Sequence, residues 1–116
     1  MLDAEYSIDV QHQTKEVTIV VRGNFQEKDA EYFVNDYQEK IGSIPAKDFD
    51  LVVDSKSLVV VSQKILPLLE ECYKMYKASG FKRVKFIASS VTVGMQLKRI
   101  AKKTELDNAE VEVISQ

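Results

Sequence analysis

The sequence predicts an α/β domain built around a mixed β-sheet. Segments rich in β-branched residues alternate with segments of helical period, and the first two β-segments follow one another with no helix between them. A strand–helix–strand crossover within one sheet is almost always parallel and right-handed, whereas two strands joined by a short turn are antiparallel. The predicted order is therefore β-β-α-β-α-β-α-β, in a single domain of residues 1–116.

The chain opens with a predicted hairpin. Tyr6–Val10 alternates apolar and polar residues, and Glu16–Arg22 is rich in valine and isoleucine. The polar segment Gln11–Lys15 between them has the composition of a turn. These two strands are expected to pair antiparallel at the start of the sheet.

A helix and a central strand follow. Apolar residues recur at helical spacing at Ala30, Phe33, Val34, Tyr37 and Ile41. Gly42 and Pro45 end this helix, because both residues disfavour its continuation. Phe49–Asp54 has a continuous apolar centre, which is typical of a strand in the middle of a sheet. The segment Ser55–Val61 has no clear period.

A second helix is expected to begin near Ser62 or Gln63 and to end at Gly80, a residue suited to a left-handed cap. Pro67 fits this helix only if the helix starts late, because proline is tolerated in the first turn alone. The apolar stripe of this helix is Ile65, Leu66, Leu69, Cys72, Tyr73 and Tyr76.

The last part of the chain repeats the alternation. Arg83–Ala88 is a predicted strand, and Ser89, Ser90 or Thr92 is placed to cap the helix that follows. The inner face of that helix is Val93, Leu97, Ile100 and Ala101. Glu110–Ile114 alternates again and is predicted to be an edge strand.

The composition excludes several classes of protein. With 45% hydrophobic and 29% charged residues, the chain is expected to fold rather than to be disordered. No apolar run approaches the roughly 18 to 20 residues of a membrane span. The acidic start, Met1–Glu5, lacks the pattern of a secretory signal, so a cytoplasmic location is expected.

Charge is distributed in blocks although the net charge is only −2. Residues 1–54 carry 12 acids and 5 bases, whereas residues 72–103 carry nine bases and no acid. The basic block 82–103 suggests attraction to an acidic partner or to nucleic acid. The block contains a single aromatic residue, Phe86, and this scarcity and the acidic balance of the whole chain argue against dedicated nucleic-acid binding.

Catalytic and metal-binding residues are scarce. The one cysteine, Cys72, lies on an apolar stripe and is predicted to be a core residue. The one histidine, His12, lies in a polar turn and is expected to be solvated. Neither a zinc site nor a nucleotide-binding glycine loop is present, so we expect no cofactor and no enzymatic activity.

The order of elements and several short stretches resemble the STAS family, which includes bacterial anti-sigma-factor antagonists and the cytoplasmic tails of sulfate transporters. Val20–Phe25 resembles the strand and turn before the first helix of that family, and Phe49–Asp54 resembles its central strand. Asp54–Ser57 is similar to the start of the functional loop, and Phe86–Val91 followed by Leu97 is similar to the fourth strand and third helix.

The family motif Asp-Ser-Ser-Gly, whose first serine accepts phosphate, aligns with Ser62, Gln63, Lys64 and Ile65. The phosphoacceptor position therefore holds Gln63, and the resemblance implies that the phosphorylation switch is lost. Ser62 is a possible phosphoacceptor if the alignment shifts by one residue, and a helix N-cap otherwise. Many family members continue into a further helix after the last strand, so an incompletely covered edge or face is expected to meet a partner.

Three functions follow as hypotheses. The favoured one is a non-enzymatic regulatory module that binds a protein partner, either another protein or a second copy, through Asp54, Ser57, Ser62, Gln63 and Lys64. The second is a small-ligand or anion site at the carboxyl ends of the strands, formed by Asp54, Ser89 and Ser90. The third is weak binding of nucleic acid or an acidic partner through the basic block.

Overall fold

The computed structural model describes residues 6–23, 27–58, 63–64 and 66–114. It begins with the predicted hairpin, in which β1 (Tyr6–Gln11) pairs antiparallel with β2 (Glu16–Gly23). Lys15, at the end of the connecting turn, has a positive φ of 54°, which lets the chain reverse over a short segment. The hairpin forms one edge of a sheet whose strand order is β1-β2-β3-β4-β5.

The remaining strands follow one another in parallel across the sheet. They are β3 (Asp50–Leu58), β4 (Arg83–Ala88) and β5 (Ala109–Val113). The connections contain α1 (Glu27–Ile41), the short 3-10 helix η1 (Ala46–Asp48), α2 (Leu66–Ser79) and α3 (Val91–Lys103). The predicted mixed α/β sheet and element order are therefore confirmed.

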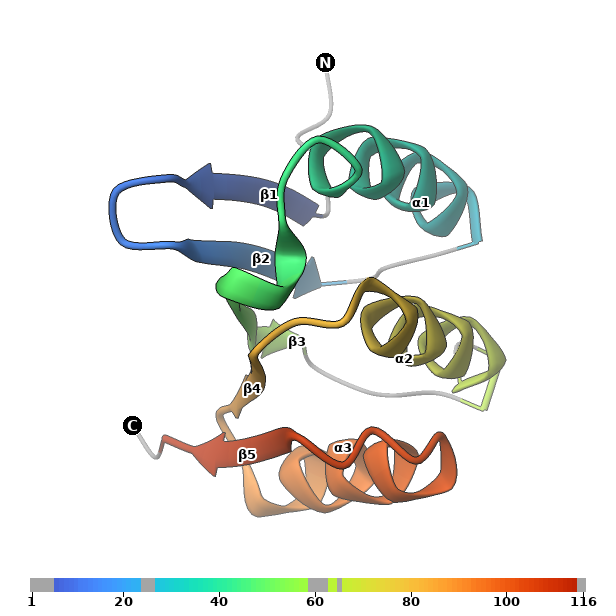
Figure 1. The fold of residues 1–116 in the computed structure, drawn as a ribbon. Coiled ribbons are helices and arrows are strands. Elements are labelled where there is room, and N and C mark those ends of the chain that lie inside the picture. Colours follow the sequence, from blue (N-terminus) through green and yellow to red (C-terminus); the bar gives the residue numbers. More distant parts are fainter. Residues whose placement is uncertain (1–5, 24–26, 59–62, 65, 115–116) are drawn as a thin grey trace.

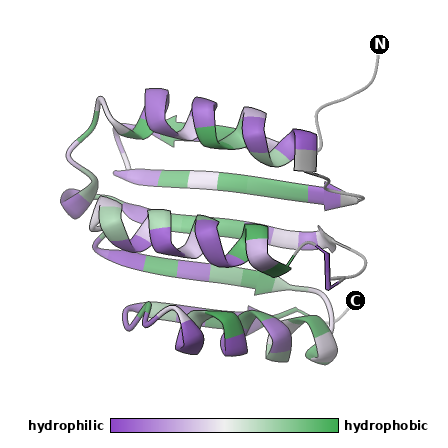
Figure 2. Ribbon diagram, turned by 90° about the vertical axis from the view of Figure 1, so that its right-hand side faces the viewer, coloured by the Kyte–Doolittle hydropathy of each residue, from purple (hydrophilic) through white to green (hydrophobic). Residues whose placement is uncertain are grey.

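All three α-helices lie on the same side of the sheet, as Figure 1 shows. Each crossover moves the chain one strand further in the same direction, and crossovers of one hand then fall on one face. Figure 2 shows α1, α2 and α3 side by side over the strands. The described residues thus form two layers, one of helices and one of strands, and they leave the other sheet face uncovered.

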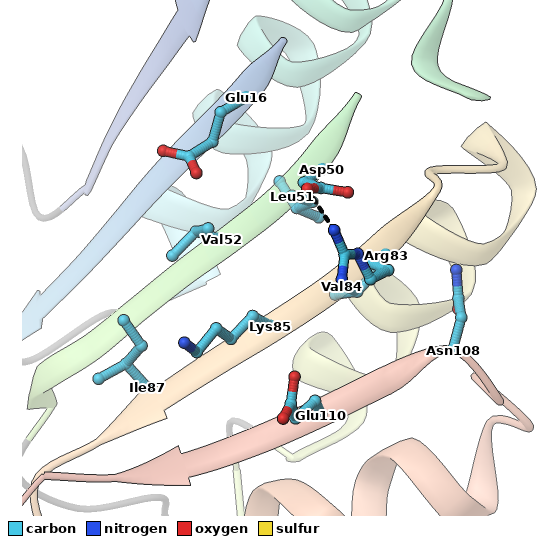
Figure 3. Close-up of a pocket in the computed structure, with 10 residues that line it drawn as sticks. All are labelled: Glu16, Asp50, Leu51, Val52, Arg83, Val84, Lys85, Ile87, Asn108 and Glu110. Atoms are coloured by element: carbon cyan, nitrogen blue, oxygen red, sulfur yellow. Dashed lines mark hydrogen bonds and ion pairs between the residues drawn. The ribbon is translucent and has the colours of Figure 1, made fainter. Parts of the chain in front are cut away.

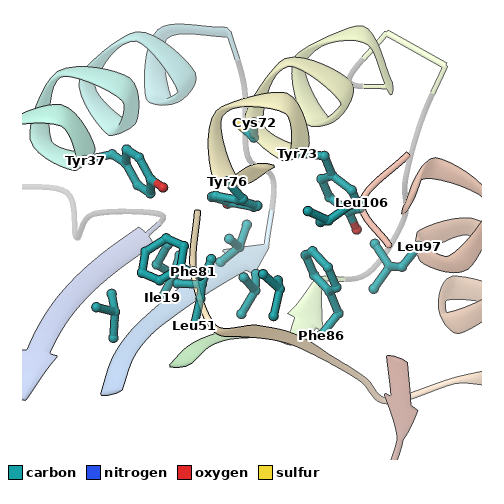
Figure 4. Close-up of a cluster of buried hydrophobic side chains, with 14 of the residues drawn as sticks. Ile19, Tyr37, Leu51, Cys72, Tyr73, Tyr76, Phe81, Phe86, Leu97 and Leu106 are labelled. Atoms are coloured by element: carbon teal, nitrogen blue, oxygen red, sulfur yellow. The ribbon is translucent and has the colours of Figure 1, made fainter. Parts of the chain in front are cut away.

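The core lies between these two layers. Val17, Ile19, Leu51, Val84 and Phe86 point from the strands toward the helices and are almost completely buried. Large side chains from α1 and α2 meet them, as Figure 4 shows for three buried tyrosines: Tyr37, Tyr73 and Tyr76. Tyr73 stacks on Phe86 with ring centroids 4.4 Å apart and an interplanar angle of 13°. Aromatic burial on this scale supplies much of the packing energy of a small domain.

The predicted carboxyl-terminal ends of α1 and α2 agree with the structure. Gly42 follows α1 directly and Gly80 follows α2 with φ 77°, the left-handed conformation expected of a glycine cap. The start of α2 was predicted too early, because Gln63 and Lys64 lie in a turn and the helix begins at Leu66. The late start places Pro67 in the first turn, where its missing N–H leaves no helical bond unmade.

Two other boundaries differ slightly from the sequence prediction. The central strand continues beyond Asp54 to Leu58, so much of the segment without a clear period is extended. The last strand is Ala109–Val113 rather than Glu110–Ile114, and it lies at the sheet edge as predicted. Within the described residues, no helix combines the length and apolar character needed to cross a membrane.

Candidate functional site

The candidate site lies at the carboxyl end of β3, where the regular pairing with β2 is interrupted. Val20 pairs with Asp54, but the next recorded pair joins Arg22 to Ser57, so Ser55 and Lys56 together oppose one residue of β2. This arrangement is a β-bulge, and such bulges often redirect side chains next to functional sites. The bulge changes which face of the sheet each following residue occupies.

Ser55 and Ser57 consequently face opposite sides of the sheet. Ser55 is buried and lines a small apolar cavity between the sheet and α2, together with Val53 and Cys72. Ser57 pairs with Arg22, and paired residues of neighbouring strands share one face. Regular alternation from Val53 would have placed Ser57 on the helix side, so the bulge is what brings it to the uncovered face.

Asp54 also lies on the uncovered face, between Val20 and Ile87 of the neighbouring strands. One carboxylate oxygen, Oδ1, accepts a hydrogen bond of 3.0 Å from the backbone N–H of Lys56. The other, Oδ2, is 3.7 Å from the Lys56 ammonium. Both interactions hold the Asp54 carboxylate against the bulge, so Lys56, which the sequence analysis did not single out, belongs to the site.

The other predicted contact residues follow β3 along the chain. Gln63 and Lys64 are exposed in a turn shortly before α2, so both are accessible to a partner. Ser62, predicted as a cap or possible phosphoacceptor, lies outside the described residues. The described α2 begins four positions after Ser62, at Leu66, rather than directly beyond it.

Ser89 and Ser90, the predicted ligand residues, follow β4 and precede α3. The Ser90 hydroxyl accepts a hydrogen bond of 3.1 Å from the backbone N–H of Val93, which makes Ser90 the N-cap of α3. Its oxygen therefore already has a partner on the helix side of the sheet. Asp54 points to the opposite face, so the structure does not gather Asp54 and Ser90 into one cluster.

The basic block is also divided between two surfaces. Arg83 and Lys85 lie on the uncovered sheet face, where Arg83 is 3.5 Å from Asp50 and Lys85 is 2.8 Å from Glu112. The Glu112 carboxylate raises the pKa of Lys85. Four other bases of the block lie on α3, on the helix side of the molecule: Lys98, Arg99, Lys102 and Lys103. Lys82 is exposed just before β4. The sequence pattern assigned these bases to a strand and a helix, but it does not specify that the helices leave the face of Arg83 and Lys85 uncovered.

The residues with the greatest chemical reactivity are placed for structural roles. Cys72 is buried as predicted, and burial raises the pKa of its thiol to about 12, so it remains protonated at neutral pH. His12 is exposed in the hairpin turn, with its ring edge-on to Phe49 at a centroid distance of 6.0 Å. Within the described ranges, no three histidine, cysteine or acidic side chains are grouped so that they could hold a metal ion.

Comparison with known proteins identifies the architecture. No protein-family model and no curated protein matches the chain. Among solved structures, a variant of RsbS from Moorella thermoacetica, a STAS-domain anti-sigma-factor antagonist, superposes with a TM-score of 0.65. The match covers 92% of this chain and 86% of that chain, at 14% sequence identity. At this identity the likeness concerns the fold, and the chain therefore has a STAS-like fold.

Proposed function

We propose that the chain is a non-enzymatic regulatory module that binds a protein partner, in the manner of an anti-sigma-factor antagonist but without the phosphorylation switch. The proposed contact surface is the carboxyl end of β3 and the segment that leads to α2. It contains Asp54, Ser57, Ser62, Gln63 and Lys64, as the sequence suggested, and Lys56 in addition.

The β-bulge in β3 is the observation that carries this proposal. It brings Ser57 to the uncovered face of the sheet, where Asp54 already lies, and the chain then leads to the exposed turn at Gln63 and Lys64. These groups are polar or charged and lie within residues 54–64. A surface of this kind favours specific docking over catalysis, because its described residues offer hydrogen-bonding and charged groups without a nucleophile beside a general base.

The proposed loss of the switch rests on the alignment of the family motif with Ser62–Ile65. Gln63 occupies the position of the phosphoacceptor, and an amide side chain cannot accept a phosphoryl group as a serine hydroxyl does. Phosphorylation of this chain then does not regulate its binding to the partner. Control of the interaction would come from the amount of each protein or from a change in the partner.

Site-specific photo-crosslinking in the source cell tests the proposed contact surface. A benzophenone amino acid at Gln63 or Lys64 is expected to give an adduct with one protein. The same amino acid at Glu39, exposed on α1, serves as the matched control and is expected to give none. The adduct from Gln63 should weaken when Asp54 is changed to Ala, because the carboxylate lies on the proposed surface. Equal adducts from Gln63 and Glu39 would contradict the proposal.

A phosphorylation assay tests the second part of the proposal. The purified chain is incubated with ATP and a kinase that phosphorylates STAS-domain antagonists, and the products are mapped by mass spectrometry. We expect no phosphate between Ser55 and Lys64. Stoichiometric phosphate on Ser62, lost in Ser62→Ala, would mean that the switch is retained one position earlier.

A further inference from the structure

The uncovered face of the sheet is unusual for strands of this orientation. Strands β2 to β5 are parallel, and parallel sheets are normally covered by helices on both faces. Here the three helices cover one face only (Figure 1). The centre of the other face carries three half-buried aliphatic side chains, Val20, Val52 and Ile87. Such a face is expected to pack against something further.

A shallow hollow of about 410 Å³ lies on this face, over β2, β3, β4 and β5 (Figure 3). Val52 and Ile87 contribute to its floor, and Glu16 and Glu110 line it from β2 and β5. Across the middle of the sheet, one row of side chains on this face runs Asp9, Thr18, Val52, Lys85 and Glu110. The hollow is therefore an aliphatic floor with charged side chains around it.

The unbalanced charge around the hollow is negative. Arg83 and Lys85 are each engaged by an acid on the same face, Asp50 and Glu112 respectively. Glu16 and Glu110, in contrast, form no ion pair with any other residue that the structure describes. An occupant that matches this surface presents apolar side chains and unpaired cations on one face.

Helix α3 presents such a face on its exposed side. Two of its apolar side chains, Val91 and Met95, are 66% and 56% exposed. Lys98 and Lys102 continue the same stripe, because residues four, seven and eleven positions after Val91 share one helix face. Neither lysine forms an ion pair within the described part of the chain, and α3 contains no acidic residue.

The buried and paired residues of α3 fix the direction of this stripe. Lys103 is 3.0 Å from Glu70 of α2, and Gly94 approaches Val113 of β5. The sides of the helix that carry Lys103 and Gly94 thus face α2 and the sheet. The Val91, Met95, Lys98 and Lys102 stripe is directed away from the rest of the chain and is available to a partner.

We propose that the uncovered sheet face of one copy receives the α3 stripe of a second copy. Within one copy the two surfaces lie on opposite sides of the sheet, so they cannot meet without another molecule (Figure 1). Met95 and Val91 pack on the aliphatic floor, while Lys98 and Lys102 reach Glu16 and Glu110. Because two different surfaces are joined, the contact is heterologous and continues into a ring or a chain of copies.

The mass of the chain in solution is the first test. Sedimentation equilibrium is expected to give a mass of 13.2 kDa when dilute and at least twice that value when concentrated. The association should weaken as salt rises from about 0.1 M to about 1 M, which shortens the screening length from about 10 Å to about 3 Å. A monomeric mass at every concentration would overturn the proposal, because the occupant of the uncovered face would then be a different protein.

Charge reversal at each surface is the second test. Lys98→Glu with Lys102→Glu, on α3, is expected to abolish association. The matched control is Lys28→Glu with Lys77→Glu, which changes the net charge equally at two exposed lysines of α1 and α2. The control is expected to associate like the original chain.

The sheet face is reversed in a separate variant, Glu16→Lys with Glu110→Lys, which is also expected to be monomeric. Its control is Glu31→Lys with Glu39→Lys on α1. An equimolar mixture of the reversed α3 variant and the reversed sheet variant should associate again, because each unmodified surface then finds its counterpart. Association that survives either reversal, or a mixture that stays monomeric, would overturn the proposal. Neither result bears on the contact proposed at Gln63 and Lys64.

Discussion

Two buried tyrosines offer the sharpest test of the packing, because the same chemical change is expected to have opposite effects. Tyr37 and Tyr73 are each 2% exposed and lie in the same core (Figure 4). The Tyr37 hydroxyl donates to Ser79 Oγ at 2.6 Å, since Ser79 itself donates to the Met75 carbonyl oxygen. The Tyr73 hydroxyl has no hydrogen-bond partner among the described residues. Phenylalanine at either position removes only the hydroxyl.

The expected magnitudes follow from what each hydroxyl contributes. Tyr37→Phe removes a hydrogen bond with a net value of about 0.5 to 1.5 kcal/mol, so the free energy of unfolding should fall by about 1 kcal/mol. Tyr73→Phe removes a buried group whose lost hydration costs about 1 to 3 kcal/mol. The ring stack with Phe86 is retained. Tyr73→Phe should therefore raise the free energy of unfolding, by about 1 kcal/mol.

Urea unfolding followed by circular dichroism measures both effects, with equal m-values required for the comparison. The two midpoints should lie on opposite sides of the midpoint of the original chain. A loss of stability in Tyr73→Phe equal to that in Tyr37→Phe would refute the reasoning, because it would mean that the Tyr73 hydroxyl is satisfied in solution.

Three further changes test the packing of α3, its cap and the buried thiol. Gly94→Ala should destabilise the fold by about 1 kcal/mol in urea, because overpacking of about 1 to 3 kcal/mol exceeds the helix preference for alanine. The new Cβ would lie 2.6 Å from Val113 Cγ2. The same change should therefore become stabilising when Val113→Ala is already present. If Gly94→Ala is still destabilising in that background, the proposed packing is wrong. Ser90→Ala should lower stability by about 1 kcal/mol through loss of the N-cap bond to Val93, and Ser90→Asp should retain it. The pKa of Cys72 is raised by burial from 9.0 to about 12, so its stabilising contribution is complete below pH 9 and is lost as the pH rises toward 12. Stability should fall by at most about 1.4 kcal/mol per pH unit from this group, and Cys72→Ala should show a shallower decline; identical slopes would refute the assignment.

Much of the architecture could be predicted because local pattern and tertiary packing agree. The three α-helices were signalled by the period of their apolar residues, and the hairpin and central strand by alternation or by runs of β-branched residues. Gly80 was signalled by its suitability for a left-handed cap. The start of α2 was the main error. The apolar stripe continues upstream of Pro67, so periodicity extended the helix too far, whereas the restriction that proline imposes gave the better boundary.

The candidate site was less predictable, because its geometry depends on pairing between strands. The bulge at Ser55 and Lys56 is visible only in the register of β2 against β3, and no residue type there requires it. For the same reason the sequence grouped Asp54 with Ser90, although they belong to opposite faces of the sheet. The uncovered face itself follows from the strand order, which helix and strand patterns do not specify.

The consecutive strand order also determines which part of the domain can unfold locally. Every strand pairs only with strands adjacent to it in the chain, so no pairing depends on a distant segment being in place first. The unit of α3 and β5 forms the last step of this series, and β5 is hydrogen-bonded to β4 alone. Its separation breaks none of the pairings among β1 to β4. This unit can therefore open as one local transition, and its amide protons should exchange with solvent before those of β2 and β3.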